Sequence, residues 1–127
     1  MNLQISKVLK LQNIYNKIHE QKLPIKLTYK ISKLFAAINE ETEFYYEKLR
    51  EIVDNYAERD EEGNPVPANS GPGVKIQKDL IPECQKQLDE LASLEVMLPD
   101  IRFTLDELEP MDMTVDDFTL LLPFVDE

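Results

Sequence analysis

A single periodic stripe of apolar residues does most to limit the folds open to this chain. Between residues 24 and 58 the stripe advances in steps of three or four residues. Its members are Leu27, Ile31, Leu34, Ile38, Thr42, Tyr45, Leu49, Ile52 and Tyr56. A near-heptad pattern of this length is typical of an amphipathic helix that packs along another helix. At 1.5 Å per residue the helix would be about 50 Å long, so it needs a partner beside it.

Residues 79–94 provide a suitable partner. Ile81, Cys84, Leu88 and Leu91 repeat at steps of three, four and three. Asp79 is a candidate helix cap, and Pro82 would be tolerated in the first turn. We therefore predict a coiled-coil-like antiparallel hairpin, with residues 24–58 packed against residues 79–94.

The connection between the two helices, residues 59–76, contains all three glycines of the chain and three of its eight prolines. Such residues stop helices and allow the chain to reverse. We predict a mobile hairpin connection, of which 74–76 is a candidate short strand. A calcium loop is excluded by spacing, because Gly63 precedes Asn64 and the twelfth position is Gly71 rather than a glutamate.

The two ends of the chain contribute shorter elements. Residues 2–5 alternate polar and apolar, as in a strand that could pair with the extended run 96–103. Ser6 would then cap a first helix whose apolar stripe is Val8, Leu11, Tyr15 and Ile18. Thr104–Glu107 and Thr114–Asp117 are capping-box patterns, and Pro123 interrupts the helix that the second one starts.

Together these elements predict a mainly α fold in a single domain, residues 1–127. It comprises a long antiparallel helical hairpin, a short N-terminal helix, a minor β element and a packed C-terminal helix. We expect the last segment, residues 114–127, to dock on the rest of the protein. Phe124 would then turn inward, and the acids of the segment could meet lysines of residues 7–33.

Composition favours a non-enzymatic protein. The net charge is −11, although residues 1–36 hold seven lysines and one acid. The single histidine, His19, has no nucleophile and orienting partner in a recognisable pattern, and Cys84 lies on an apolar stripe. We therefore predict no catalytic residues, no cofactor and no metal site.

Two sets of residues are candidates for binding a protein partner. The first set is in the acidic, apolar C-terminal segment and comprises Asp116, Asp117, Phe118, Leu122 and Phe124. The second set is on the carboxylate face of the long helix and comprises Glu43, Glu47 and Glu51. A short amphipathic segment can dock in a groove of a partner protein. Docking of the C-terminal segment on a partner, rather than on its own chain, therefore stays an alternative.

The order of these pieces resembles a group of small helical proteins of unknown function that tailed phages and prophages encode. The resemblance lies in KLPIKLTYKISKLFAAINEETEFYYEKLREIVDNYAERDEEGNPV, in QLDELASLEV and in the closing DDFTLLLPFVDE. It implies a phage or prophage origin and no enzymatic role. No binding residues come with it.

From these observations we expect an interaction protein that acts in particle assembly or on a host component. Its partner would be a phage or host protein rather than nucleic acid or a membrane, and a homo-oligomer stays open. The alternative is an acidic DNA mimic that inhibits a host nuclease or DNA-binding protein, since spaced carboxylates can stand in for phosphates. The N-terminus lacks the apolar stretch of a signal peptide, so we expect the host cytoplasm, with the virion as a second location.

Overall fold

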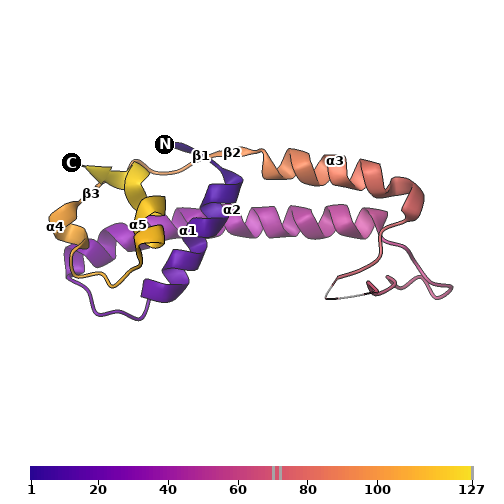
Figure 1. Ribbon diagram of the computed structural model, residues 1–127, viewed down its shortest axis with the longest axis horizontal. Helices are drawn as coiled ribbons and strands as arrows, with labels where there is room; N and C mark the ends of the chain where they lie inside the picture. Colours follow the sequence, from indigo (N-terminus) through magenta and orange to yellow (C-terminus); the bar gives the residue numbers. More distant parts are fainter. Residues whose placement is uncertain (70, 72, 127) are drawn as a thin grey trace. The chain divides into compact units, whose positions relative to one another are not determined.

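The computed structural model describes residues 1–69, 71 and 73–126, which form two compact units (Figure 1). The terminal unit comprises Met1–Glu43 and Glu95–Glu127, and the hairpin unit comprises Phe44–Leu94. Helix α2, Ile25–Tyr56, contributes residues to both units. The expectation of a single domain, residues 1–127, stays a prediction.

The terminal unit combines helices with two small sheets. Its elements, apart from the first part of α2, are β1 (Asn2–Gln4), α1 (Ile5–Ile18), β2 (Glu95–Met97), β3 (Phe103–Thr104), α4 (Leu105–Leu108), α5 (Val115–Leu121), the 3-10 turn η2 (Leu122–Phe124) and β4 (Val125–Asp126). Strand β1 pairs antiparallel with β2, with Leu3 opposite Val96. Strand β3 pairs in parallel with β4. The predicted pairing of the N-terminal strand with the run around Val96 is thus confirmed.

The core of the terminal unit is formed by α1, the first part of α2 and the C-terminal segment. Helix α1 buries Ile5, Val8, Leu11, Ile14 and Ile18. The apolar stripe predicted from the sequence included Tyr15, whereas the structure buries its neighbour Ile14. The other three stripe residues, Val8, Leu11 and Ile18, are buried as expected. Tyr15 is half-buried at the edge of the core, with the centroid of its ring 5.1 Å from that of Phe35.

In the hairpin unit, α3 (Ile81–Ala92) runs antiparallel to the last part of α2 (Figure 1). The predicted long helical hairpin is therefore confirmed. Its seam is only partly covered. The stripe residues in this part of α2, which are Tyr45, Leu49, Ile52 and Tyr56, are half-buried, whereas those from Leu27 to Thr42 are buried. On α3, Cys84 and Leu91 are buried and Ile81 is exposed.

The connection between α2 and α3 contains backbone hydrogen bonds of the β type. The Glu58 N–H donates to the Lys75 carbonyl at 2.8 Å, and the Val66 N–H donates to the Glu58 carbonyl at 2.9 Å. Val74 and Ile76 take part in isolated bridges rather than in a named strand. Gly63, with φ of 85°, provides the left-handed turn that follows the acidic residues 60–62. The expected mobility of this connection stays a prediction, and its residues 70 and 72 lie outside the described part.

The predicted caps were right for the C-terminal helices and wrong for α1 and α3. Both threonine capping boxes are present, at Thr104 and at Thr114. Ser6 is not a cap, because β1 leads directly into α1 and Gln4 occupies the capping position. Asp79 is not a cap either, because it lies inside the 3-10 turn η1 (Lys78–Leu80) that precedes α3.

Candidate protein-interaction site

Helices α4 and α5 start in the same way, each with a complete capping box. At α4, the Glu107 N–H donates to Oγ1 of Thr104 at 3.2 Å, and the Thr104 N–H donates to Oε1 of Glu107 at 3.0 Å. At α5, the Asp117 N–H donates to Oγ1 of Thr114 at 3.1 Å, and Asp117 Oδ2 accepts from the Thr114 N–H at 3.5 Å. These bonds satisfy N–H groups that would otherwise lack partners in such short helices.

Each capping-box acid also binds a lysine from the N-terminal third of the chain. Lys30 Nζ lies 2.8 Å from Glu107 and also donates to the Arg102 carbonyl. Lys17 Nζ lies 3.1 Å from Oδ1 of Asp117. The expectation that acids of the C-terminal segment meet lysines of residues 7–33 is confirmed at Asp117. The two ion pairs hold α4 and α5 on the terminal unit.

The pKa values of both acids reflect these contacts. The hydrogen bond from Lys30, helped by the Thr104 N–H, lowers the pKa of Glu107 below its ordinary value. Burial acts to raise the pKa of Asp117, but the hydrogen bonds from Lys17 and the Thr114 N–H outweigh it, so this pKa is lowered as well. Both groups are therefore held in their charged forms.

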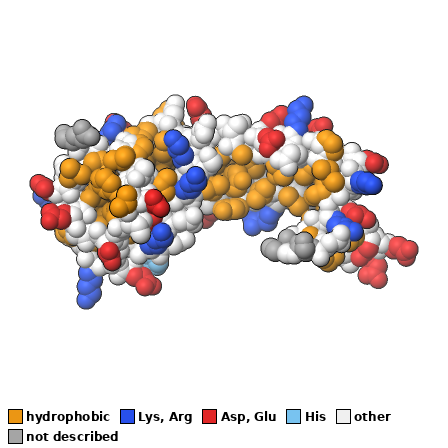
Figure 2. Space-filling model, viewed as in Figure 1, with side chains coloured by type: hydrophobic (Ala, Val, Ile, Leu, Met, Phe, Trp, Pro, Cys, Tyr) orange, Lys and Arg blue, Asp and Glu red, His pale blue; other side chains and the backbone are white. Residues whose placement is uncertain are grey.

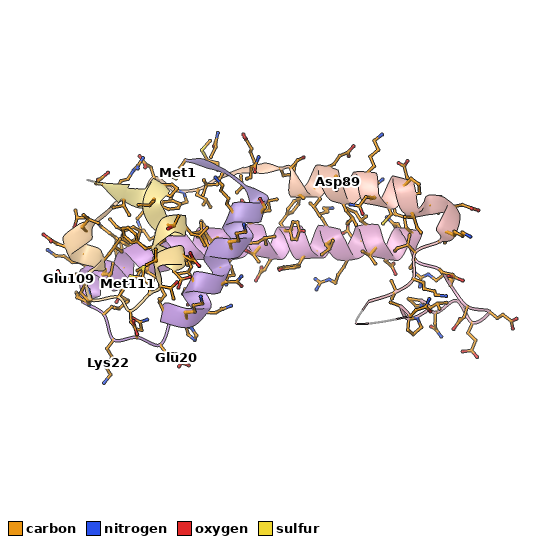
Figure 3. All side chains as sticks on the ribbon, viewed as in Figure 1. Met1, Glu20, Lys22, Asp89, Glu109 and Met111 are labelled. Carbon is orange, nitrogen blue, oxygen red and sulfur yellow. The ribbon has the colours of Figure 1, made fainter. Side chains whose placement is uncertain are left out.

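An apolar groove of about 460 Å³ lies between α4 and α5. It is lined by Leu105, Asp106, Leu108, Glu109, Met111, Met113, Thr114, Val115 and Phe118. Leu108 and Met111 are buried and form its base. Figure 2 shows hydrophobic side chains at the surface over this C-terminal segment, and Figure 3 labels Glu109 and Met111 in the connection that follows α4. We call this feature the α4–α5 groove.

Two exposed apolar residues occupy equivalent positions at the groove. Leu105 is 56% exposed and Val115 is 82% exposed, and each directly follows the threonine of a capping box. A capping box uses the side chains of the threonine and of the residue three positions later. The residue directly after the threonine takes no part in it, so that residue can be polar without loss of helix stability. Sequence reasoning missed both residues. The signal was present, as an apolar residue after the threonine in TLDE and again in TVDD.

The structure separates the candidate binding residues of the C-terminal segment. Phe124 is fully buried, so the inward turn expected after Pro123 is confirmed, and Asp117 is 5% exposed. Phe118 is half-buried in the lining of the α4–α5 groove, whereas Asp116 and Leu122 are exposed. A role in partner binding stays a prediction for all five, and Asp116, Phe118 and Leu122 are accessible for it.

The second candidate set is exposed on α2. Glu43, Glu47 and Glu51 follow one another at four-residue spacing, and all three are exposed. Glu51 lies 3.1 Å from Lys48 Nζ. Farther along, Asp54 lies 2.6 Å from Arg59. Neighbouring cations therefore offset part of the negative charge on this face.

The hairpin unit has an apolar groove of its own, of about 270 Å³. Its lining residues are Phe44, Lys48, Ile52, Gln87, Glu90, Leu91 and Leu94. It arises because two helices alone cannot cover each other's apolar faces. The charged residues at its edge have opposite signs, so the groove carries no clear preference for the charge of a ligand.

His19 and Cys84, the residues weighed for chemistry from the sequence, belong to different units, and each has its own local environment. His19 bonds the backbone carbonyls of Tyr15 and Asn16 and stacks on the Tyr15 ring. Cys84 is buried, and burial raises the pKa of its thiol. Among the described residues, no group of three or more His, Cys, Asp or Glu side chains could hold a metal ion.

Comparisons with known proteins gave no relative: no protein-family model, no curated protein and no solved structure matches this chain. Within the described residues, each helix is too short or too polar to cross a membrane.

Proposed function

We propose that this chain is a non-enzymatic interaction protein of phage or prophage origin that acts in particle assembly or on a host component. The observation that carries the proposal is the α4–α5 groove, with Leu105 and Val115 exposed beside it. Exposed apolar side chains gathered at a concave surface are typical of protein-binding sites. The resemblance to phage-encoded proteins supports the origin, and the host cytoplasm or the virion is the corresponding location.

The ion pairs at the two capping boxes also support an interaction role. They fix α4 and α5 on the terminal unit, so the groove has a defined shape before any partner arrives. A surface that is ordered in advance loses less conformational freedom on binding. In this proposal the segment is docked on the terminal unit and presents a surface, rather than acting as a free peptide motif.

Deletion of the gene tests the proposal. We expect a change in particle yield, in particle composition or in sensitivity to host defences. A second strain should carry Leu105→Ser with Val115→Ser, two changes at exposed positions that leave the core intact. If the deletion strain matched the wild type in all three measurements, the proposed function would be wrong.

A second candidate function is an acidic DNA mimic, favoured by the exposed carboxylates Glu43, Glu47 and Glu51. A mimic would occupy the basic cleft of a host nuclease or DNA-binding protein, and its binding would weaken steeply with salt. The ion pair between Lys48 and Glu51 counts against this candidate. Capture of a DNA-binding protein that is lost at high salt and in Glu43→Gln with Glu47→Gln would favour it.

A further inference from the structure

We propose that the α4–α5 groove binds a basic amphipathic helix of a partner protein. The inference rests on the proposed interaction function and adds the chemistry of the partner. It follows from three properties of the groove, which are its apolar base, its uncompensated acidic edge and the placement of its exposed apolar residues on two helices.

The apolar base can accept large side chains. Leu108 and Met111 are buried beneath it, and Met113 and Phe118 add half-buried apolar surface. Its volume of about 460 Å³ is within the range of roughly 300–1,000 Å³ that is usual for ligand pockets. Methionine side chains are flexible and polarisable, so a groove that contains two of them can adapt to different apolar side chains.

The charges at the groove favour a basic ligand. Its charged lining residues are Asp106 and Glu109, and both are acidic. In the described part of the chain, neither takes part in an ion pair, whereas the neighbouring acids Glu107 and Asp117 are paired with Lys30 and Lys17. Uncompensated carboxylates around an apolar base attract a partner that carries lysine or arginine beside its apolar residues.

The exposed apolar residues favour a helix as the binding element. Leu105 belongs to α4 and Val115 to α5, and each is followed by an exposed aspartate, Asp106 or Asp116. A ligand that covers both must present apolar side chains along one line with cations at its flanks. An amphipathic helix meets this requirement with apolar residues at positions i, i+3, i+4 and i+7.

Binding of synthetic peptides to the full chain tests the inference, with fluorescence anisotropy as the measurement. The main probe is a helical peptide of leucine and lysine with leucines at the spacing given above. A leucine–glutamate peptide of the same pattern tests charge, and a glutamine–lysine peptide with the same lysines tests the need for apolar contact. We expect the leucine–lysine peptide to bind most tightly and its affinity to fall several-fold as salt rises from about 50 to 300 mM.

Paired variants assign the binding to the groove. Leu105→Ser with Val115→Ser should lower the affinity for the leucine–lysine peptide about tenfold or more. The reason is that the complex would lose two apolar contacts that binding buries. Asp106→Asn with Glu109→Gln should lower it about threefold and reduce its dependence on salt. The matched controls are Met97→Ser and Asp126→Asn, at exposed positions outside the lining, and these should stay within about twofold of the wild type.

The contrary outcomes are distinct. Equal affinity for the glutamine–lysine peptide would mean attraction by net charge alone and would overturn the inference. Binding of the leucine–glutamate peptide that is lost in the Leu105/Val115 variant would overturn the basic chemistry and leave the interaction function standing. A dimer of the free protein that the same variant abolishes, seen by size-exclusion chromatography, would make a second copy the occupant and overturn the partner helix.

Discussion

Lys17 Nζ lies 3.1 Å from Oδ1 of Asp117, so the first helix of the chain binds the last one across 100 residues of sequence. Asp117 is also the third residue of the α5 capping box. One carboxylate therefore both starts α5 and fixes it against α1. Because the α4–α5 groove is formed by these docked helices, the ion pair also helps to maintain the candidate interaction surface.

Replacement of Asp117 by asparagine should lower the free energy of unfolding by about 1–2 kcal/mol, because a charge-assisted hydrogen bond is lost at a buried position. The loss is limited because the Lys17 side chain is 57% exposed and water can solvate it. Urea unfolding followed by circular dichroism would measure the change. Asp116→Asn, at the exposed neighbouring position, is the control and should change stability by less than about 0.5 kcal/mol. Equal effects of the two substitutions would contradict the assigned role of Asp117.

Stability should also fall in acid through Asp117 and Glu107. Both carboxyl groups have lowered pKa values in the folded protein, so the unfolded chain takes up protons first as the pH falls. Their contribution is complete above the unfolded pKa values of about 3.9 and 4.3 and is lost as the pH drops through the folded-state values. Urea midpoints at several pH values from about 5.5 down to 2.5 would follow the loss.

A lysine variant isolates this effect from the other acids of the chain. Lys17→Met with Lys30→Met removes both cations and should flatten the decline in stability over the same pH range. The comparison separates the two ion pairs from the rest of a chain that holds 25 acidic residues in all. The same pH dependence in the variant and the wild type would show that the two ion pairs do not govern the acid response.

The sequence allowed the helices to be predicted well and the exposed site poorly. The apolar stripe from Leu27 to Tyr56 predicted α2, because the burial of one helix face makes apolar residues recur every three or four positions in the sequence. The threonine boxes at α4 and α5 were readable for a similar reason, since the cap and its acid are three residues apart. Both features depend on residues close together in the chain.

Other features depend on contacts between distant residues. The pairing of Lys30 with Glu107 joins residues 77 positions apart, and no local pattern specifies it. The α4–α5 groove was missed because Leu105 and Val115 fit no periodic stripe. The Asp79 cap was wrong because the sequence does not mark where the 3-10 turn η1 gives way to α3.

The two parts of the apolar stripe should respond differently to a buried charge. Leu34 is fully buried in the terminal unit, and Leu34→Asp should cost more than about 4 kcal/mol because it places an unpaired carboxylate in the core. Leu49 is half-buried on the hairpin seam, so Leu49→Asp should cost about half as much or less, since water can reach the new charge. Thermal melts of both variants would rank them. A greater loss for Leu49→Asp would contradict the burial seen along α2.

The docking of the C-terminal segment leads to a final prediction. Phe124 and Leu121 are buried in the terminal unit, so truncation after Met113 removes core side chains and leaves apolar surface on α1 exposed. We expect an earlier melting transition and aggregation on heating, measured by circular dichroism and light scattering. The point variant Phe124→Ala should lower the free energy of unfolding by about 3–5 kcal/mol. Leu122→Ser, at an exposed position of the same segment, serves as its control and should melt close to the wild type. Unchanged stability of the truncated protein, together with loss of partner binding, would mean that the segment acts as a binding motif and not as part of the core.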